Sequence, residues 1–229
     1  MSTRRMTLLD DAEFIMKRLP GCRVEIMGGI ITVTMLPDAA HASVLSHVMG
    51  AFFSAGLHED TADIVQRVGL WLPSGPDDYA IPDLSLVAPD AEDHLVKYNC
   101  YAPAAFRMAL EVTSNNYQND LRVKVACYAM AAIPVYVIVD REHQRVQVLT
   151  DPMDGEYASN RVYFPGQSAP LPDSIGVSVS LDVAALLKSG KPSTNPPSPT
   201  PAAPSAAPTP PPPGSGTPHT AGTGTAPAR

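Results

Sequence analysis

Residues 109–140 read ALEVTSNNYQNDLRVKVACYAMAAIPVYVIVD and predict a strand, a turn, a helix and a second strand. The side chains of residues 107–112 alternate, so that Leu110 and Glu111 fall on opposite faces of the first strand. The Ser-Asn-Asn turn offers side chains that cap helices, and residues 135–139 form a β-rich run typical of a strand covered on both faces. This order predicts a parallel crossover within a sheet.

The helix predicted from about Tyr117 carries a lysine that leans inward. Its apolar stripe comprises Leu121, Val125, Tyr128, Ala129 and Ala132, and Pro134 ends the helix. At about 100° per residue, Lys124 lies only about 40–60° around the helix from the stripe. We therefore expect Lys124 to face the protein, where it can meet the carboxylate that leaves the preceding strand.

The composition divides the chain of 229 residues into two parts. Residues 190–229 hold 13 of the 25 prolines and otherwise consist mainly of Ala, Thr, Ser and Gly. Such a segment has too few apolar side chains to form a core, and we expect a disordered tail that acts as a spacer. Residues 1–189 have the size of one domain with a substantial core.

Charge and cysteine content limit the partners of the domain. The formal charge is −7 for the chain and −9 for residues 1–189, which does not favour tight, non-specific nucleic-acid binding. Cys22, Cys100 and Cys127 are odd in number and lack metal-ligand spacing, which favours a reduced, cytoplasmic protein. We recognise no signal peptide, and no run of about 18 apolar residues that would cross a membrane.

The remaining pattern predicts a mixed α/β fold with one parallel crossover in an otherwise meander-like sheet. Gly28-Gly29 is a strong hairpin signal, and 90–105 is a polar, irregular connection. The expected helices are 7–18, 39–55 and 182–187, and the expected strands are 23–27, 30–36, 64–72, 84–88, 145–150, 157–164 and one near Val177.

Four charged residues stand at strand ends or strand edges in this arrangement, namely Glu25, Asp83, Glu111 and Lys124. Two carboxylates on neighbouring strands can hold one hard divalent cation such as Mg²⁺. A nearby ammonium group can position or help to deprotonate an attacking water, while the metal stabilises charge on a phosphate. The pattern therefore predicts metal-assisted hydrolysis of a phosphate ester.

Several motifs together resemble a known family. They are RVEIMGGII (23–31), PDLSLV (82–87), LEVTS (110–114), D-x-x-x-K-x-x-x-Y (120–128) and IPVYVIVD (133–140). In this order they are similar to the Uma-type family of putative restriction endonucleases, within the PD-(D/E)XK nuclease superfamily, over roughly Thr7 to Leu187. The resemblance implies a restriction-endonuclease-like core, with a mixed sheet flanked by helices.

The resemblance also implies roles for individual residues. Asp83 and Glu111 would bind Mg²⁺ or Mn²⁺, Lys124 would be the catalytic lysine, and Glu25 an accessory acid. The implied substrate is nucleic acid, with DNA preferred, and a homodimer suits the cutting of two strands. One departure concerns Thr113, which stands where the superfamily signature has lysine. The Uma-type family resembles a form in which the following helix supplies this lysine.

Simpler readings stay open for each residue. Asp83 is consistent with a turn, Glu25 with an outward strand acid, and Glu111 and Lys124 with a structural ion pair. An exposed Asp120–Lys124 pair is another alternative, and Lys124 can also reach solvent along Tyr128. His41 and His47 fit capping or surface positions, with His41 a minor candidate near the cleft. The rival functions are a nuclease-fold binding or regulatory module with little turnover, and a phosphoesterase of small substrates.

Overall fold

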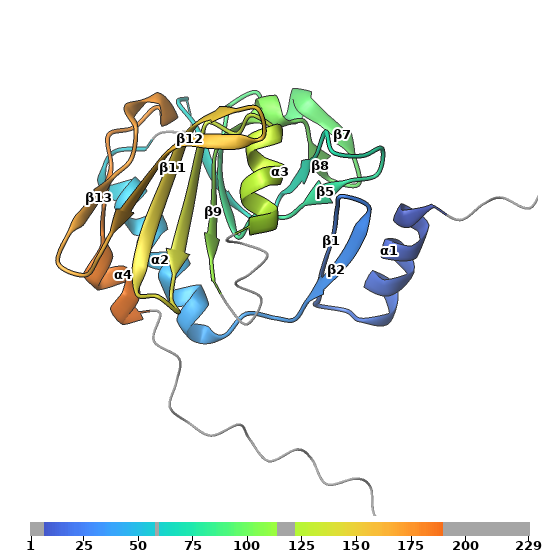
Figure 1. Cartoon of the computed structure of the whole chain (residues 1–229), viewed down its shortest axis with the longest axis horizontal. Coiled ribbons are helices and arrows are strands. Elements are labelled where there is room, and N and C mark those ends of the chain that lie inside the picture. Colours follow the sequence, from blue (N-terminus) through green and yellow to red (C-terminus); the bar gives the residue numbers. More distant parts are fainter. Residues whose placement is uncertain (1–6, 58–59, 114–121, 190–229) are drawn as a thin grey trace, which may run out of the picture. The chain divides into compact units, whose positions relative to one another are not determined.

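The computed structural model describes residues 7–57, 60–113 and 122–189 (Figure 1). The chain divides into two compact units, Met1–Ser193 and Thr194–Arg229, and all described residues belong to the first. The tail predicted over 190–229 lies outside the described residues, as does Asp120. The domain boundary and the disorder of the tail therefore stay predictions.

Two mixed six-stranded sheets form the domain. The first sheet has the order β2 (Ile30–Thr34), β1 (Arg23–Met27), β5 (Tyr79–Ala80), β4 (Gly69–Trp71), β8 (Cys100–Tyr101) and β7 (Leu95–Lys97). The central sheet has the order β12 (Glu156–Tyr163), β11 (Arg145–Met153), β10 (Val135–Asp140), β9 (Phe106–Val112), β6 (Leu84–Val87) and β3 (Asp63–Gln66). Strands β9 and β10 are parallel, which confirms the predicted crossover. Two short strands, β13 (Ser168–Pro170) and β14 (Ser180–Asp182), pair separately.

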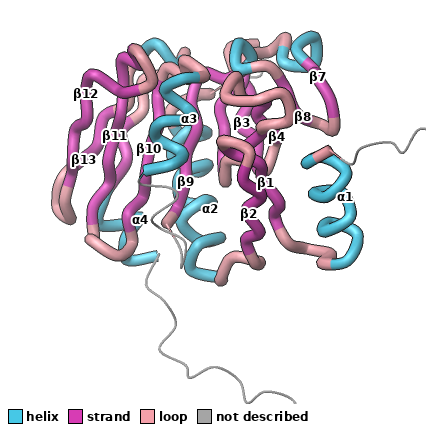
Figure 2. Tube along the Cα trace, turned by 45° about the vertical axis from the view of Figure 1, so that its right-hand side comes forward, coloured by secondary structure: helices cyan, strands magenta, loops and turns pink. Residues whose placement is uncertain are grey.

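Within the described part of the chain, four α-helices accompany the sheets: α1 (Leu8–Arg18), α2 (Ala39–Ser54), α3 (Lys124–Met130) and α4 (Val183–Ser189). Helices α2 and α4 cover one face of the central sheet and α3 covers the other, while α1 packs on the β1–β2 hairpin (Figure 2). The described residues also contain 3₁₀ turns at Ala91–His94, Pro103–Ala105 and Asp173–Ile175. Among the helices within the described ranges, none has the length and apolar character needed to cross a bilayer.

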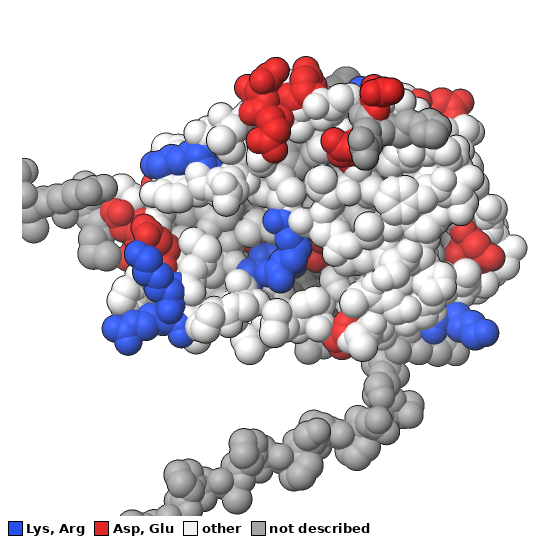
Figure 3. Space-filling view, turned by 180° about the vertical axis from the view of Figure 1, so that it is seen from behind, with Lys and Arg blue, Asp and Glu red and all other residues white. Residues whose placement is uncertain are grey.

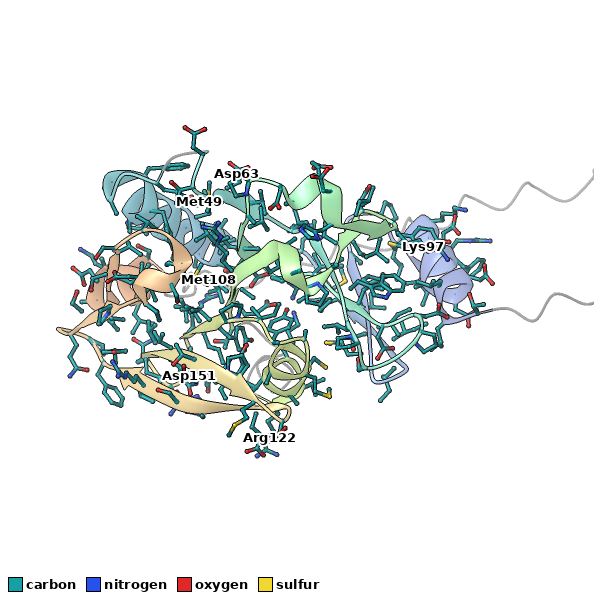
Figure 4. All side chains as sticks on the ribbon, turned by 90° about the horizontal axis from the view of Figure 1, so that it is seen from above. Met49, Asp63, Lys97, Met108, Arg122 and Asp151 are labelled. Atoms are coloured by element: carbon teal, nitrogen blue, oxygen red, sulfur yellow. The ribbon has the colours of Figure 1, made fainter. Side chains whose placement is uncertain are left out.

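The alternation of side chains predicted for β9 determines on which face of the central sheet Glu111 lies. Met108 and Leu110 are fully buried in the cluster formed with α2 and α4, and Figure 4 shows Met108 in the interior. Ala109 packs instead with Tyr128 of α3 and Tyr136 of β10. Because successive side chains alternate, Glu111 leaves β9 on the α3 side of the sheet.

Two strand predictions are wrong. The strand expected over 64–72 is two strands, β3 and β4, which belong to different sheets. Arg67, between the two strands, adopts a left-handed φ of 55°, so the chain turns there. Gly69, the first residue of β4, lies so close to Cys100 that a Cβ at this position would overlap the Cys100 side chain. The strand expected near Val177 begins three residues later, at Ser180.

Two further predictions need correction. The connection over 90–105, expected to be irregular, contains the short strands β7 and β8. The α3 stripe does not extend to Ala132, which is exposed and left-handed with φ of 54° and so lies beyond the helix end. Strands of two or three residues and the last turn of a helix are both too short to display a period in the sequence.

Asp38 caps α2 and also binds an arginine of the β10–β11 turn. Its side chain accepts a hydrogen bond from His41 N at 2.7 Å and two from the Arg141 guanidinium at 3.1 and 3.0 Å. We expect Asp38→Ala to lower the free energy of unfolding by about 1 kcal/mol, measured in urea near pH 7, because the cap is lost. Asp38→Asn keeps a good capping side chain, and an equal loss in both variants would contradict this account.

The pH dependence of the difference in unfolding free energy between the parent chain and Asp38→Ala provides a second check. Burial raises the pKa of Asp38, but the hydrogen bonds from Arg141 and His41 outweigh it and hold the pKa below the ordinary 3.8. A carboxylate with a lowered pKa stabilises the fold above its ordinary pKa, and this contribution is lost as the pH falls through the folded value. The stability gap between the parent chain and Asp38→Ala should therefore narrow below pH 3.8.

Candidate active site

The four residues predicted to form the site lie together in the interior. Glu25 comes from β1, Asp83 directly precedes β6, Glu111 is the next-to-last residue of β9, and Lys124 opens α3. All four are buried, with Glu111 fully enclosed and Asp83 the most exposed at 6%. With Arg23 of β1 they form what we call the carboxylate cluster.

Lys124 joins two of the carboxylates. Its Nζ lies 2.7 Å from Glu111 Oε1 and 3.0 Å from Glu25 Oε1, so the inward orientation predicted for the lysine is confirmed. Glu25 Oε1 also accepts a hydrogen bond from Ile81 N at 2.7 Å. The readings of Glu25 as an outward acid, and of Lys124 as a residue that reaches solvent, are therefore wrong.

Tyr128 completes the environment of Glu111. Its hydroxyl donates to Glu111 Oε1 at 2.9 Å, one helical turn beyond Lys124. Burial raises the pKa of Tyr128 well above 10, so the phenol remains a neutral donor. Burial also raises the pKa of the Glu111 carboxyl, while the charge of Lys124 acts in the opposite direction. Glu111 therefore depends on nearby cations to remain ionised.

Asp83 is held at both carboxylate oxygens. Oδ1 accepts a hydrogen bond from Arg23 Nη1 at 2.7 Å, and Oδ2 lies 2.9 Å from both His41 Nε2 and Val112 N. His41 is only 4% exposed, so the expectation of a surface position is wrong for this residue. Burial and the charge of Arg141 lower the pKa of His41, so a neutral ring donates to Asp83 through Nε2.

Arg23 is the member of the cluster that the sequence analysis missed. Its Nη1 lies 2.7 Å from Asp83 Oδ1 and 3.5 Å from Glu111 Oε2, and its Nε lies 3.3 Å from Glu25 Oε2. Burial lowers the pKa of Arg23, but the three carboxylates outweigh it and raise the pKa above its ordinary value. A signal was available, because residues two apart on a strand share a face and Arg23 precedes Glu25 by two.

Thr113 stands at the position where the superfamily signature has lysine, and its side chain has a structural role there. This buried side chain accepts a hydrogen bond from Arg141 N at 2.9 Å and donates to Val139 O at 3.4 Å. It therefore joins the ends of β9 and β10 and does not point a charged group at Glu111. The cation that contacts Glu111 from the following helix is Lys124.

A groove with a volume of about 1080 Å³ opens above the cluster. Arg23, His41 and Asp83 line it, and so do Arg67 and Arg141. Figure 3, which shows the molecule from behind, has basic side chains in a hollow near the middle of this face. The groove thus places one carboxylate of the cluster, Asp83, among the charges of Arg23, Arg67 and Arg141, which can attract a phosphate group, while Asp38 and Glu142 also line it.

The residues present fit a divalent cation as a two-carboxylate site. Among the described residues, no three His, Cys, Asp or Glu side chains are grouped to hold a metal. However, Glu111 Oε2 is buried and accepts no hydrogen bond from described residues, and it faces the same Arg23 Nη1 as Asp83 Oδ1. Two carboxylates with water and substrate oxygens completing the shell are the usual environment of Mg²⁺.

Comparison with known proteins assigns the chain to a family. The model of the family described as Uma2, putative restriction endonuclease, matches residues 11–184. The chain belongs to this family. The suspected family resemblance is thereby confirmed, and each of the sequence motifs quoted for it overlaps the matched range.

A solved structure supports the fold of this Uma2-family chain. The crystal structure of a putative nuclease belonging to DUF820 from Anabaena variabilis ATCC 29413 aligns with a TM-score of 0.59 and 17% identity. The alignment covers 82% of this chain and 100% of the other, so the predicted α/β nuclease fold with helices flanking a mixed sheet is confirmed. No curated protein matches the chain.

Proposed function

We propose that this Uma2-family chain is a Mg²⁺-dependent endonuclease that hydrolyses phosphodiester bonds of nucleic acid, with DNA as the preferred substrate. The observation that carries the proposal is the convergence of Asp83, Glu111 and Lys124 in one buried cluster, of which Asp83 lines a groove that also contains Arg67 and Arg141. Buried carboxylates are costly to a fold unless they are paired or hold a metal. Arg23 and Lys124 pair with these acids but leave one negative charge of the cluster uncompensated, which a bound metal would offset.

Asp83 Oδ1 and Glu111 Oε2 are the atoms that would hold Mg²⁺, or Mn²⁺ in its place, as their remaining oxygens are engaged by protein donors. The bound ion would lower the pKa of an attacking water and stabilise negative charge on the phosphate. His41 fixes the orientation of Asp83, and Tyr128 that of Glu111. Such outer partners commonly contribute about 10–100-fold to metal affinity or activity.

Lys124 supplies a fixed positive charge beside Glu111, one of the two proposed metal ligands. Glu25 and Glu111 hold its Nζ on two sides, so the ammonium group has little freedom to turn away. From this position it can donate a hydrogen bond to the attacking water or to a phosphate oxygen. Glu25 accordingly acts as a positioning residue in this proposal, and a homodimer would provide two sites for the two strands of a duplex.

A second function has one observation in its favour. Arg23 and Lys124 already offset two of the three carboxylate charges, so protein groups alone supply most of the charge compensation of the cluster. A nuclease-fold binding or regulatory module with little turnover would need no more than this. A thermal-shift titration separates the two functions, because a true metal site raises the melting temperature as the ion concentration rises. A flat response to Mg²⁺ and Mn²⁺ would favour the binding module.

The proposed activity predicts nicking of supercoiled plasmid that requires Mg²⁺ and stops when EDTA is added. An Asp83→Asn/Lys124→Ala double variant should be inactive. A matched control is Glu13→Gln/Lys17→Ala, which removes an exposed acid–lysine pair on α1 and should cut like the parent chain. Equal cleavage by the site variant and the parent would refute the proposal. Turnover of a model phosphodiester without cleavage of any nucleic acid would indicate a small-substrate phosphoesterase.

A further inference from the structure

Arg23 lies where the proposed metal would be expected. Its Nη1 contacts Asp83 Oδ1 at 2.7 Å and lies 3.5 Å from Glu111 Oε2, and these are the two oxygens assigned to the ion. Magnesium binds oxygen at about 2.0–2.1 Å, so an ion held by both oxygens would stand directly against the guanidinium. Two cations in contact repel each other strongly in a buried site. The same oxygens therefore bind either Arg23 or the metal.

The charge balance of the cluster supports such an exchange. With its three carboxylates ionised, the cluster has one negative charge left after pairing with Arg23 and Lys124. A divalent ion added beside Arg23 would leave the buried cluster with excess positive charge. If the guanidinium leaves as the ion enters, the charges of the cluster cancel. Buried charge is tolerated only when it is compensated in this way.

Arg23 also has a route out of the cluster. Its side chain is 12% exposed, the largest exposed fraction among the cations and carboxylates of the cluster, and it lines the groove. Its Nη1 donates a hydrogen bond to Ile81 O at 3.0 Å, and its Nε is buried without hydrogen-bond geometry to any partner among the described residues. Lys124, by contrast, is 1% exposed and held by two glutamates.

We propose that Arg23 is an exchangeable cation that occupies the metal position between Asp83 and Glu111 and moves into the groove when a divalent ion binds. This inference rests on the proposed metal-dependent function and adds a residue that sets the metal affinity. Arg23 is thus a competitor of the ion in the free protein. Once displaced, its guanidinium lies in the groove, where it can bind a phosphate of the substrate bidentately.

The test is calorimetric titration of the full chain with Mg²⁺ and with Mn²⁺, in the absence of nucleic acid. Arg23→Gln should bind either ion at least about tenfold more tightly than the parent, because the competing charge is gone. The control is Arg67→Gln, which removes an exposed arginine from the same groove and should change the affinity by no more than about twofold. Equal or weaker metal binding by Arg23→Gln would overturn the proposal.

Thermal unfolding covers the case in which Arg23→Gln is unstable. Without its guanidinium the variant should melt at a lower temperature in EDTA, and Mg²⁺ should raise this temperature more than it does in the parent. A loss of stability that Mg²⁺ does not reverse contradicts the exchange. If neither protein binds the ions, the exchange and the metal-dependent function both fail. If the parent binds Mg²⁺ and cuts DNA while Arg23→Gln has an unchanged affinity, only the exchange fails.

Discussion

Lys124→Met should lower the rate of Mg²⁺-dependent plasmid nicking by about 10²–10⁴-fold, the range expected for loss of a positioned group that assists proton transfer. Methionine matches the lysine side chain out to Cε but lacks the ammonium group. The same substitution leaves Glu25 and Glu111 facing each other without their shared cation. Breaking a buried ion pair on one side costs about 3–5 kcal/mol, so the free energy of unfolding should fall as well.

Measuring both quantities separates catalysis from stability. The cleavage rate is divided by the fraction of folded protein, determined by circular dichroism at the assay temperature. If Lys124 is only a structural partner of Glu111, the variant will be destabilised but will retain its rate per folded molecule. Lys124→Arg serves as a second control because it retains the charge on a bulkier head group. It should recover more stability than activity if the position of the ammonium group matters.

Local rules predicted much of the fold. Thr7 and Asp10 form a capping box at the start of α1, and Gly28-Gly29 joins β1 to β2 with positive φ at both glycines. The alternation along β9 put Glu111 on the α3 side, and the helical period turned Lys124 toward it. These patterns succeed because each depends on a few neighbouring residues and on one buried face.

The arrangement of the strands in two sheets did not follow from such rules. Strands β4, β5, β7 and β8 have two or three residues each, which is too few for a period to appear. Some of their partners lie far away in sequence, as in the pairing of β1 with β5 through Ile26 and Tyr79. Arg23 was missed for a related reason. Only Glu25 lies on the same strand, and the assembled fold is needed to bring Asp83 and Glu111 within reach.

The assembled cluster links stability to the proposed chemistry. Each carboxylate would be unfavourable in the interior if it were alone, and the fold compensates them with one fixed cation, Lys124, and one that reaches the groove, Arg23. A site built in this way folds before metal arrives and keeps its ligands aligned. We infer that the metal-free protein is stable because Arg23 stands in for the ion, and that this limits its metal affinity.

Asp83→Asn should abolish the rise in melting temperature that Mg²⁺ causes and reduce plasmid nicking by more than about 100-fold. Asparagine preserves the shape of the side chain but removes the charge of a proposed ligand. Outer partners of metal ligands already contribute about 10–100-fold, so loss of the ligand itself should exceed that range. The amide group must also face one of the donors that now surround Asp83, which are Arg23 Nη1, His41 Nε2 and Val112 N, so some stability is lost too.

A second buried aspartate makes the control for this loss of stability. Asp78 is 1% exposed and accepts hydrogen bonds from Gly28 N, Gly29 N and Ser74 Oγ at 2.7, 3.2 and 2.6 Å, so it anchors the β1–β2 hairpin outside the carboxylate cluster. Asp78→Asn should therefore destabilise the protein while its melting temperature still responds to Mg²⁺. If both variants lose the rise in melting temperature with Mg²⁺, the loss reflects general destabilisation. If both variants retain this rise, Asp83 is not a metal ligand. Loss in Asp83→Asn alone ties the ion to the carboxylate that Arg23 contacts at 2.7 Å.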